Sequence, residues 1–147
     1  MKSLSLSIES DLGNVTLAAL AVKAVCLYAG LTASDADHVE LCMAEAITNS
    51  ILHAYHGKSS HQVAISVRIV KDQLEFEICD AGTAMSPDQA KRLESEERAH
   101  ENDPVDRALL SESGRGLEII RRVMDEVTYK REANRNCVAM VKRISRV

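Results

Sequence analysis

Three polar side chains recur at intervals of four residues in an otherwise apolar stretch: Glu45, Asn49 and His53. In an α-helix each step of four residues advances about 40° around the axis, so the three share one face. A carboxylate and an amide among apolar neighbours are costly to bury unless they meet a partner. The spacing is typical of a site where Asn49 gives a neutral oxygen to hydrated Mg²⁺ and Glu45 orients water or accepts a proton. The same spacing of Glu45, Asn49 and His53 is equally consistent with the solvated face of an amphipathic helix.

An acid and a glycine follow directly after a predicted strand, in the segment Asp80-Ala81-Gly82. A carboxylate at a strand end can accept a hydrogen bond from the exocyclic amine of a purine. Glycine beside it lets a flat ring or the backbone approach closely. The same residues are also typical of an ordinary turn after a strand. Alone, this motif leaves both interpretations open.

A glycine-rich stretch, Ser113-Gly114-Arg115-Gly116-Leu117, opens an apolar helical pattern. Free N–H groups and the helix dipole at such a terminus favour phosphate, the glycines permit close contact, and Arg115 can add a charge-assisted contact. A flexible loop that enters a helix has the same composition. The spacing of the glycines does not match a P-loop. A dinucleotide-binding fold requires a strand immediately before such a motif, and none is predicted here.

The elements that must position these motifs follow from the hydrophobic periodicity. A Ser34–Asp37 capping box is expected to open the second helix, and Gly57 to end it. Hairpin turns are expected at 71–73 and 133–136. Strands are predicted over 2–8, 63–70, 74–79, 127–130 and 137–144, and helices over 12–28, 34–56 and 116–124.

The stretch 81–113 differs from the rest because it is polar and contains both prolines, Pro87 and Pro104. We expect it to be a largely mobile lid with one short helix over 87–97. The order β-α-α-β-β-lid-α-β-β predicts an α+β fold. It is expected to be a two-layer α/β sandwich with a mixed, mostly antiparallel sheet and helices on one face.

Size and composition limit the classes of function. The 147 residues suit a single domain, 1–147, and 46% hydrophobic with 27% charged residues are typical of a soluble globular protein. The net charge of −4 argues against direct nucleic-acid binding. The longest uninterrupted apolar run, 17–22, is too short to span a membrane, and 1–10 lacks a signal-peptide core, so a cytoplasmic location is expected.

The four cysteines each lie in an apolar run and none forms a CxxC pair. We therefore expect reduced core residues rather than a metal site or disulfides. They are Cys26, Cys42, Cys79 and Cys137.

Taken together and in order, the three motifs resemble the N, G1 and G2 boxes of the GHKL ATPases, which include gyrase, heat-shock chaperones and histidine kinases. The segments AEAITNSILHAY and SGRGLEIIRRVMDEV are most similar to the anti-sigma-factor serine kinases. The resemblance covers nearly the whole chain and implies a Bergerat-type ATP-binding fold with ATP and Mg²⁺ as cofactors.

The resemblance also implies a role for each matching position. Glu45 would be the catalytic base and Asn49 the Mg²⁺ ligand, while Asp80 would hold adenine with Gly82 beside it. His53 would either contact phosphate or only brace the helix. The phosphates would lie against Gly114, Arg115, Gly116 and Leu117. The chain departs from its relatives after Asp80-Ala81-Gly82, where they carry more glycine or an acid.

The function expected from this resemblance is that of a serine/threonine protein kinase. It would phosphorylate a small anti-sigma-factor antagonist and sequester a sigma factor or another regulatory protein. Relatives are often dimers, so a homodimer is also expected. One alternative is a non-catalytic ATP-binding switch module. Another is a histidine-kinase catalytic domain, which normally follows a phosphoacceptor helix pair, and the last is an α/β domain without nucleotide.

Overall fold

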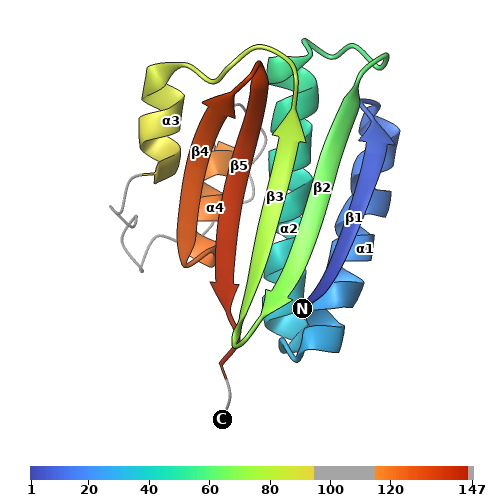
Figure 1. Cartoon of the computed structure of the whole chain (residues 1–147), viewed down its shortest axis with the longest axis vertical. Coiled ribbons are helices and arrows are strands. Elements are labelled where there is room, and N and C mark those ends of the chain that lie inside the picture. The colour runs from blue at the N-terminus through green and yellow to red at the C-terminus, as the bar shows by residue number, and fades with distance from the viewer. Residues whose placement is uncertain (95–114, 146–147) are drawn as a thin grey trace.

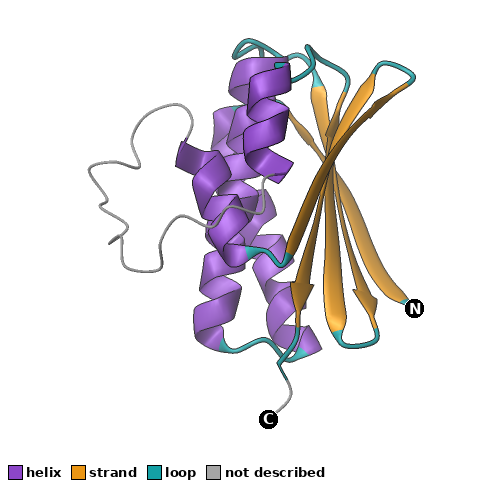
Figure 2. Cartoon of the chain, turned by 90° about the vertical axis from the view of Figure 1, so that its left-hand side faces the viewer, coloured by secondary structure: helices purple, strands orange, loops and turns teal. Residues whose placement is uncertain are grey.

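A computed structural model describes residues 1–94 and 115–145 of the chain, without the side chain of Arg115. A five-stranded sheet forms one layer, and helices cover one of its faces (Figures 1 and 2). The strands are β1 Lys2–Glu9, β2 Gln62–Val70, β3 Gln73–Asp80, β4 Glu126–Glu132 and β5 Arg135–Arg143. The helices are α1 Val15–Ala29, α2 Ala33–Asn49, α3 Pro87–Glu94 and α4 Arg115–Val123, with a 3₁₀ turn at Leu12–Asn14 and a π-helix at Ser50–Ala54.

The strand order β1-β2-β3-β5-β4 places β3 and β5 side by side although they are distant in sequence. Alternation along each strand turns one set of apolar side chains towards the helices, where Phe76, Ile78 and Met140 are almost fully buried. The predicted fold class is confirmed. Each pairing among the described strands is antiparallel, so the sheet lacks the parallel pair that a mixed sheet allows.

Helix α1 packs on α2, with Val22 and Cys26 fully buried. The segment Leu12–Ala29 has the length and apolar composition of a membrane-spanning helix. The expectation that no segment spans a membrane was based only on the uninterrupted apolar run 17–22. The inner face of α1 packs in the core, whereas Leu17, Leu20 and Leu27 are exposed and 28% of the segment is buried, so core packing accounts for only part of this composition.

The start of α2 corrects the predicted capping box. Thr32 is the N-cap, and its hydroxyl accepts a hydrogen bond from the N–H of Asp35 at 3.1 Å. Asp37 instead binds Lys23 of α1, with 2.6 Å between Nζ and Oδ1. The helix starts at Ala33 because Thr32 with Asp35 offers the same cap pattern two residues earlier.

Both hairpin turns are shorter than predicted. Ala133 and Asn134 have positive φ angles of 50° and 63°, so they form a two-residue turn, and β5 begins directly at Arg135. At the other hairpin β3 begins at Gln73. The predicted helix at 87–97 is present over Pro87–Glu94, and the rest of the predicted lid, 95–113, lies outside the described residues.

The prediction that all four cysteines are reduced is wrong for one pair. Cys26 and Cys42 are buried free thiols, and burial raises the pKa of each to about 12. Cys79 and Cys137 form a disulfide between β3 and β5. The strand register places them directly opposite one another, with 4.2 Å between their Cα atoms. Because they are 58 residues apart, no local spacing in the sequence indicates the pair.

Candidate functional site

A pocket of about 340 Å³ lies between the end of α2, the loop after β3 and the helices α3 and α4. Its lining is mixed: apolar side chains such as Leu93, Leu117 and Ile120 lie beside polar ones, among them Asn49 and Asp80. A cavity that combines apolar walls with convergent polar groups is a usual form of a small-molecule site.

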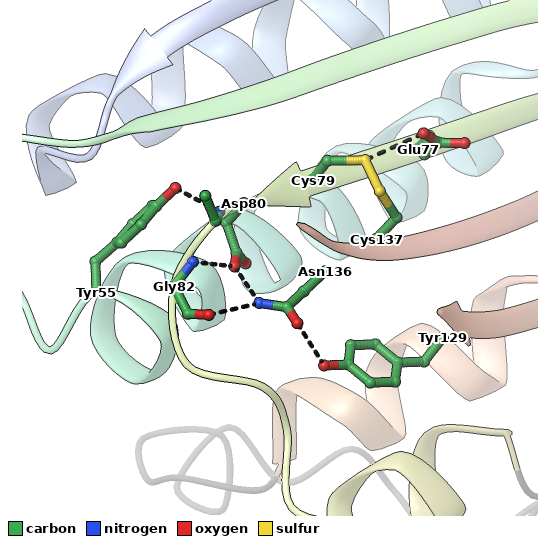
Figure 3. Close-up of a disulfide and its surroundings, with 9 residues drawn as sticks. Tyr55, Glu77, Cys79, Asp80, Gly82, Tyr129, Asn136 and Cys137 are labelled. Atoms are coloured by element: carbon green, nitrogen blue, oxygen red, sulfur yellow. Dashed lines mark hydrogen bonds between the residues drawn. A yellow bond between two sulfur atoms is a disulfide. The ribbon is translucent and has the colours of Figure 1, made fainter. Parts of the chain in front are cut away.

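Asp80 is the last residue of β3, and its carboxylate is buried at the wall of this pocket. Its Oδ1 accepts hydrogen bonds from the N–H of Gly82 at 3.1 Å and from Nδ2 of Asn136 at 2.7 Å (Figure 3). Within the described part of the chain, both side-chain hydrogen bonds fall on this one oxygen. Its Oδ2 is therefore available to a donor on a ligand.

Asn136 is a site residue that sequence reasoning placed in a hairpin turn. It is only 4% exposed and lies directly opposite Asp80 in the β3–β5 ladder. Its Nδ2 donates to Asp80 and to the carbonyl of Gly82, at 2.7 and 2.9 Å. Its Oδ1 accepts from Tyr129 at 3.1 Å and from Arg131 at 2.7 Å. Asn136 therefore fixes the position of the Asp80 carboxylate.

Gly82 lies in close contact with the end of the π-helix. A Cβ at this position would overlap the carbonyl of Ala54, so no larger residue fits without a shift. The neighbouring Thr83 N–H donates to the same carbonyl at 2.9 Å, and the Tyr55 hydroxyl accepts from the N–H of Ala81 at 2.8 Å. The glycine is needed here so that the loop after β3 can dock against the helix.

Asn49 and His53 both line the pocket, although the helix between them is not regular. Asn49 is the last α-helical residue, and a π-helix begins at Ser50, with Tyr55 N–H donating to the Ser50 carbonyl at 3.1 Å. The even four-residue spacing predicted an unbroken α-helix, which is wrong after Asn49. Short π-helical turns occur frequently at functional sites, because they redirect the side chains that follow.

Glu45 does not line the pocket but lies against the first turn of α4. A Cβ on Gly116 would come within 2.5 Å of the Glu45 Oε2 atom, so glycine is the residue that permits this contact. The Glu45 side chain is half-buried, and burial raises the pKa of its carboxyl group above the ordinary value. The structure thus brings the first and third sequence motifs together.

The structure describes the third motif only in part. Gly116 and Leu117 are buried in α4, and Leu117 lines the pocket. Gly114 lies outside the described residues, and Arg115 is placed by its backbone alone, at the start of α4. Asn49, His53, Asp80 and Leu117 therefore share one pocket, while Glu45 and Gly82 border it through α4 and the π-helix.

Known proteins resemble this chain in sequence and in structure. The family model for the histidine kinase-like ATPase domain matches residues 8–142. Serine-protein kinase RsbW of Staphylococcus aureus is 32% identical over 120 residues, which are 81% of this chain and 73% of that protein. RsbW of Oceanobacillus iheyensis is 30% identical over 113 residues, which are 77% and 69% of the two chains.

Two solved structures share the fold. The RsbU and RsbW domains of Rv1364c from Mycobacterium tuberculosis superpose with a TM-score of 0.68 at 12% identity, covering 99% of this chain and 33% of that one. The SiaB–SiaC complex from Pseudomonas aeruginosa gives a TM-score of 0.63 at 15% identity, covering 95% and 88%.

Proposed function

The chain belongs to the histidine kinase-like ATPase family, and from this premise we propose that it is an ATP-dependent serine/threonine protein kinase of a partner-switching pathway. The observation that carries the proposal is the buried Asp80 carboxylate, held by Asn136 at the wall of the pocket. Kinship with relatives named serine-protein kinases supports the reaction. The 147 residues act as one histidine kinase-like ATPase domain.

The pocket selects adenine through Asp80. Its Oδ2 accepts a hydrogen bond from the exocyclic amine of the base, and the apolar walls pack on the ring faces. Guanine carries a carbonyl oxygen at the equivalent ring position, which the carboxylate repels. A site built to bind an N–H in this way rejects the analogue that lacks it, because the buried acceptor is then left unpaired.

The residues on the phosphate side suit a triphosphate with Mg²⁺. Asn49 offers a neutral oxygen at the pocket wall, and Leu117, in the first turn of α4, lines the same pocket. Mg²⁺, when bound, would neutralise charge on the phosphate oxygens. Asn49 would hold it, and the resemblance to the family implies that Gly114 and Arg115 would contact the phosphates. His53 lines the same pocket, and we assign it to a phosphate contact.

Glu45 acts as the general base. Its carboxylate accepts the proton of the serine or threonine hydroxyl on the substrate protein as that oxygen attacks the terminal phosphate. Burial raises the pKa of this carboxyl group, which makes the carboxylate a stronger proton acceptor. Contact with Gly116 holds Glu45 beside the helix terminus at which the phosphates bind.

The protein partners are a small anti-sigma-factor antagonist, which is phosphorylated, and a sigma factor or another regulatory protein, which is sequestered. Helix α1 leaves Leu17, Leu20 and Leu27 exposed, and such apolar side chains on one helix suit a protein partner or a second copy of the chain. The protein acts in the cytoplasm, where these partners reside.

The test is a pull-down from cell lysate with ATP or ADP, followed by transfer of a labelled terminal phosphate and mapping of the phosphosites. Glu45→Gln should keep nucleotide binding but lower phosphate transfer by about 10²–10⁴-fold. Glu118→Gln, at an exposed position of α4, is the matched control and should transfer at the wild-type rate. Transfer by Glu45→Gln at the wild-type rate would refute the role of the base. ATP binding without any phosphorylated protein would instead favour the non-catalytic switch module.

A further inference from the structure

The Cys79–Cys137 disulfide lies directly beside the pair of residues that forms the adenine end of the pocket. Cys79 precedes Asp80, and Cys137 follows Asn136 (Figure 3). Because side chains alternate along a strand, Asp80 and Asn136 point towards the helices while the two sulfurs point to the opposite face. The covalent link and the hydrogen-bonded pair therefore occupy adjacent rungs of one ladder.

These two rungs are the end of the β3–β5 ladder. The register runs from Gln73↔Arg143 to Cys79↔Cys137 and finishes at Asp80↔Asn136. The last pair of a ladder has neighbours on one side only, so it opens more readily than the pairs inside the sheet. A covalent link at the preceding rung prevents the strands from separating there. The disulfide therefore holds the Asp80–Asn136 contact closed.

The disulfide also joins the two ends of the chain segment that builds one wall of the pocket. The 58-residue separation between the two cysteines includes α3, α4 and β4, which contribute Leu93, Leu117 and Tyr129 to the lining. When the link is intact, both ends of this segment are fixed at one point of the sheet. When it is broken, only non-covalent contacts hold them.

A small thiol can reach this bond from the face of the sheet that the described helices leave uncovered (Figure 2). Cys137 is partly exposed on that face, whereas Cys79 is only 2% exposed. Attack is therefore directed to the Cys137 sulfur. Glu77 Oε1 lies 3.1 Å from the Cys79 sulfur, where it can accept a hydrogen bond once that sulfur carries a proton.

We propose that Cys79 and Cys137 form a reversible thiol–disulfide modification site whose redox state sets the affinity of the neighbouring pocket for adenine nucleotides. The link to nucleotide affinity rests on the proposed function. So does the physiological setting, because disulfides of proteins that work in a reducing cytoplasm are usually transient and redox-sensing.

The exchange reaction balances with a monothiol of the glutathione class. Its thiolate attacks the Cys137 sulfur to form a mixed disulfide, and the electron pair of the broken S–S bond leaves on Cys79, which takes up a proton. A second thiolate attacks the reductant sulfur of the mixed disulfide and releases Cys137, which is also protonated. The protein gains two electrons and two protons, and two thiols become one disulfide. Oxidised glutathione reverses the sequence.

The experiment measures ADP and ATP affinity of the full chain by calorimetry after equilibration with reduced or oxidised glutathione. The redox state is read by alkylation and mass spectrometry. The ligand atoms of Glu77, Cys79 and Cys137 lie within 4.8 Å of one another, so a chelator is present to keep metal from the free thiols. Reduction should weaken nucleotide binding about fivefold, the lower end of typical coupling between linked sites.

Variants separate this effect from others. The double variant Cys79→Ser with Cys137→Ser should bind like the reduced protein and should not respond to glutathione. The matched control, Cys26→Ala with Cys42→Ala, retains the disulfide and should keep the response. Equal affinity in the two verified redox states would overturn the proposal. So would two free thiols after incubation with oxidised glutathione.

A second readout makes the outcome independent of nucleotide binding. Amide hydrogen exchange of the chain without nucleotide should become faster at 79–82 and 135–138 on reduction and should stay unchanged in β1–β2. If neither redox state binds an adenine nucleotide, the proposed function fails, and this exchange difference still decides whether the disulfide holds the end of the ladder. Identical hydrogen exchange in the reduced and oxidised states would refute the claim that the disulfide holds the end of the ladder closed.

Discussion

Replacing Asn136 by alanine tests whether this residue positions the Asp80 carboxylate. The amide makes four side-chain hydrogen bonds, two as donor to Asp80 and Gly82 and two as acceptor from Tyr129 and Arg131. At 4% exposure, these contacts lie away from bulk water. Alanine removes all four and leaves a buried carboxylate oxygen with one remaining donor among the described residues, the N–H of Gly82.

The size of the effect follows from the unpaired groups. A buried polar group that loses its partner destabilises the fold by about 1–3 kcal/mol. We place the variant in the lower half of this range, because a water molecule in the space left by the side chain can replace part of the lost hydrogen bonding. The loss of alignment at Asp80 should weaken ADP binding by a comparable free energy, roughly 5- to 30-fold for one to two kcal/mol.

The assay combines urea denaturation with calorimetric titration of ADP and GDP. Asn134→Gly is the matched control, since it removes an exposed asparagine two residues away at a positive φ angle that glycine also adopts. It should leave both measurements nearly unchanged. If Asn136→Ala binds ADP with wild-type affinity and retains the preference over GDP, then Asn136 does not position Asp80.

Three further predictions concern other parts of the molecule. Gly116→Ala should lower phosphate transfer while leaving the circular dichroism spectrum unchanged, because its methyl group would lie 2.5 Å from Glu45 Oε2 and displace the base; transfer at the wild-type rate would argue against this contact. Removing the disulfide by Cys79→Ser with Cys137→Ser should lower the free energy of unfolding by about 4 kcal/mol, from the chain-entropy estimate for the 58-residue separation, and unchanged stability in urea would contradict it. Burial raises the folded-state pKa of Glu45, so the wild type loses stability as pH rises from below the unfolded-state pKa through the folded-state pKa. Glu45→Gln mimics the protonated form, so its stability relative to the wild type should be higher at pH 7 than at pH 4. An equal stability difference between the two proteins at both pH values in urea denaturation would be inconsistent with the buried carboxylate.

Most of the element order could be predicted from the sequence because its signals are local. Alternation in β1, β2 and β3 depends on residues a few positions apart. The candidate residues Asn49, Asp80 and Leu117 could likewise be named from three short motifs, one inside a predicted helix and two at the ends of predicted elements. Periodicity and turn chemistry act over one or two turns of chain, so a sequence shows them directly.

Other features depend on which strands become neighbours, and only the tertiary structure decided them. The β3–β5 pairing joins Asp80 to Asn136 and Cys79 to Cys137 across more than fifty residues, and no spacing in the sequence indicates either pair. Whether a buried carboxylate or thiol finds a partner is set by the register between strands. The contact of Glu45 with Gly116 depends in the same way on the packing of α2 against α4, because residues so far apart in sequence become neighbours only when the core forms.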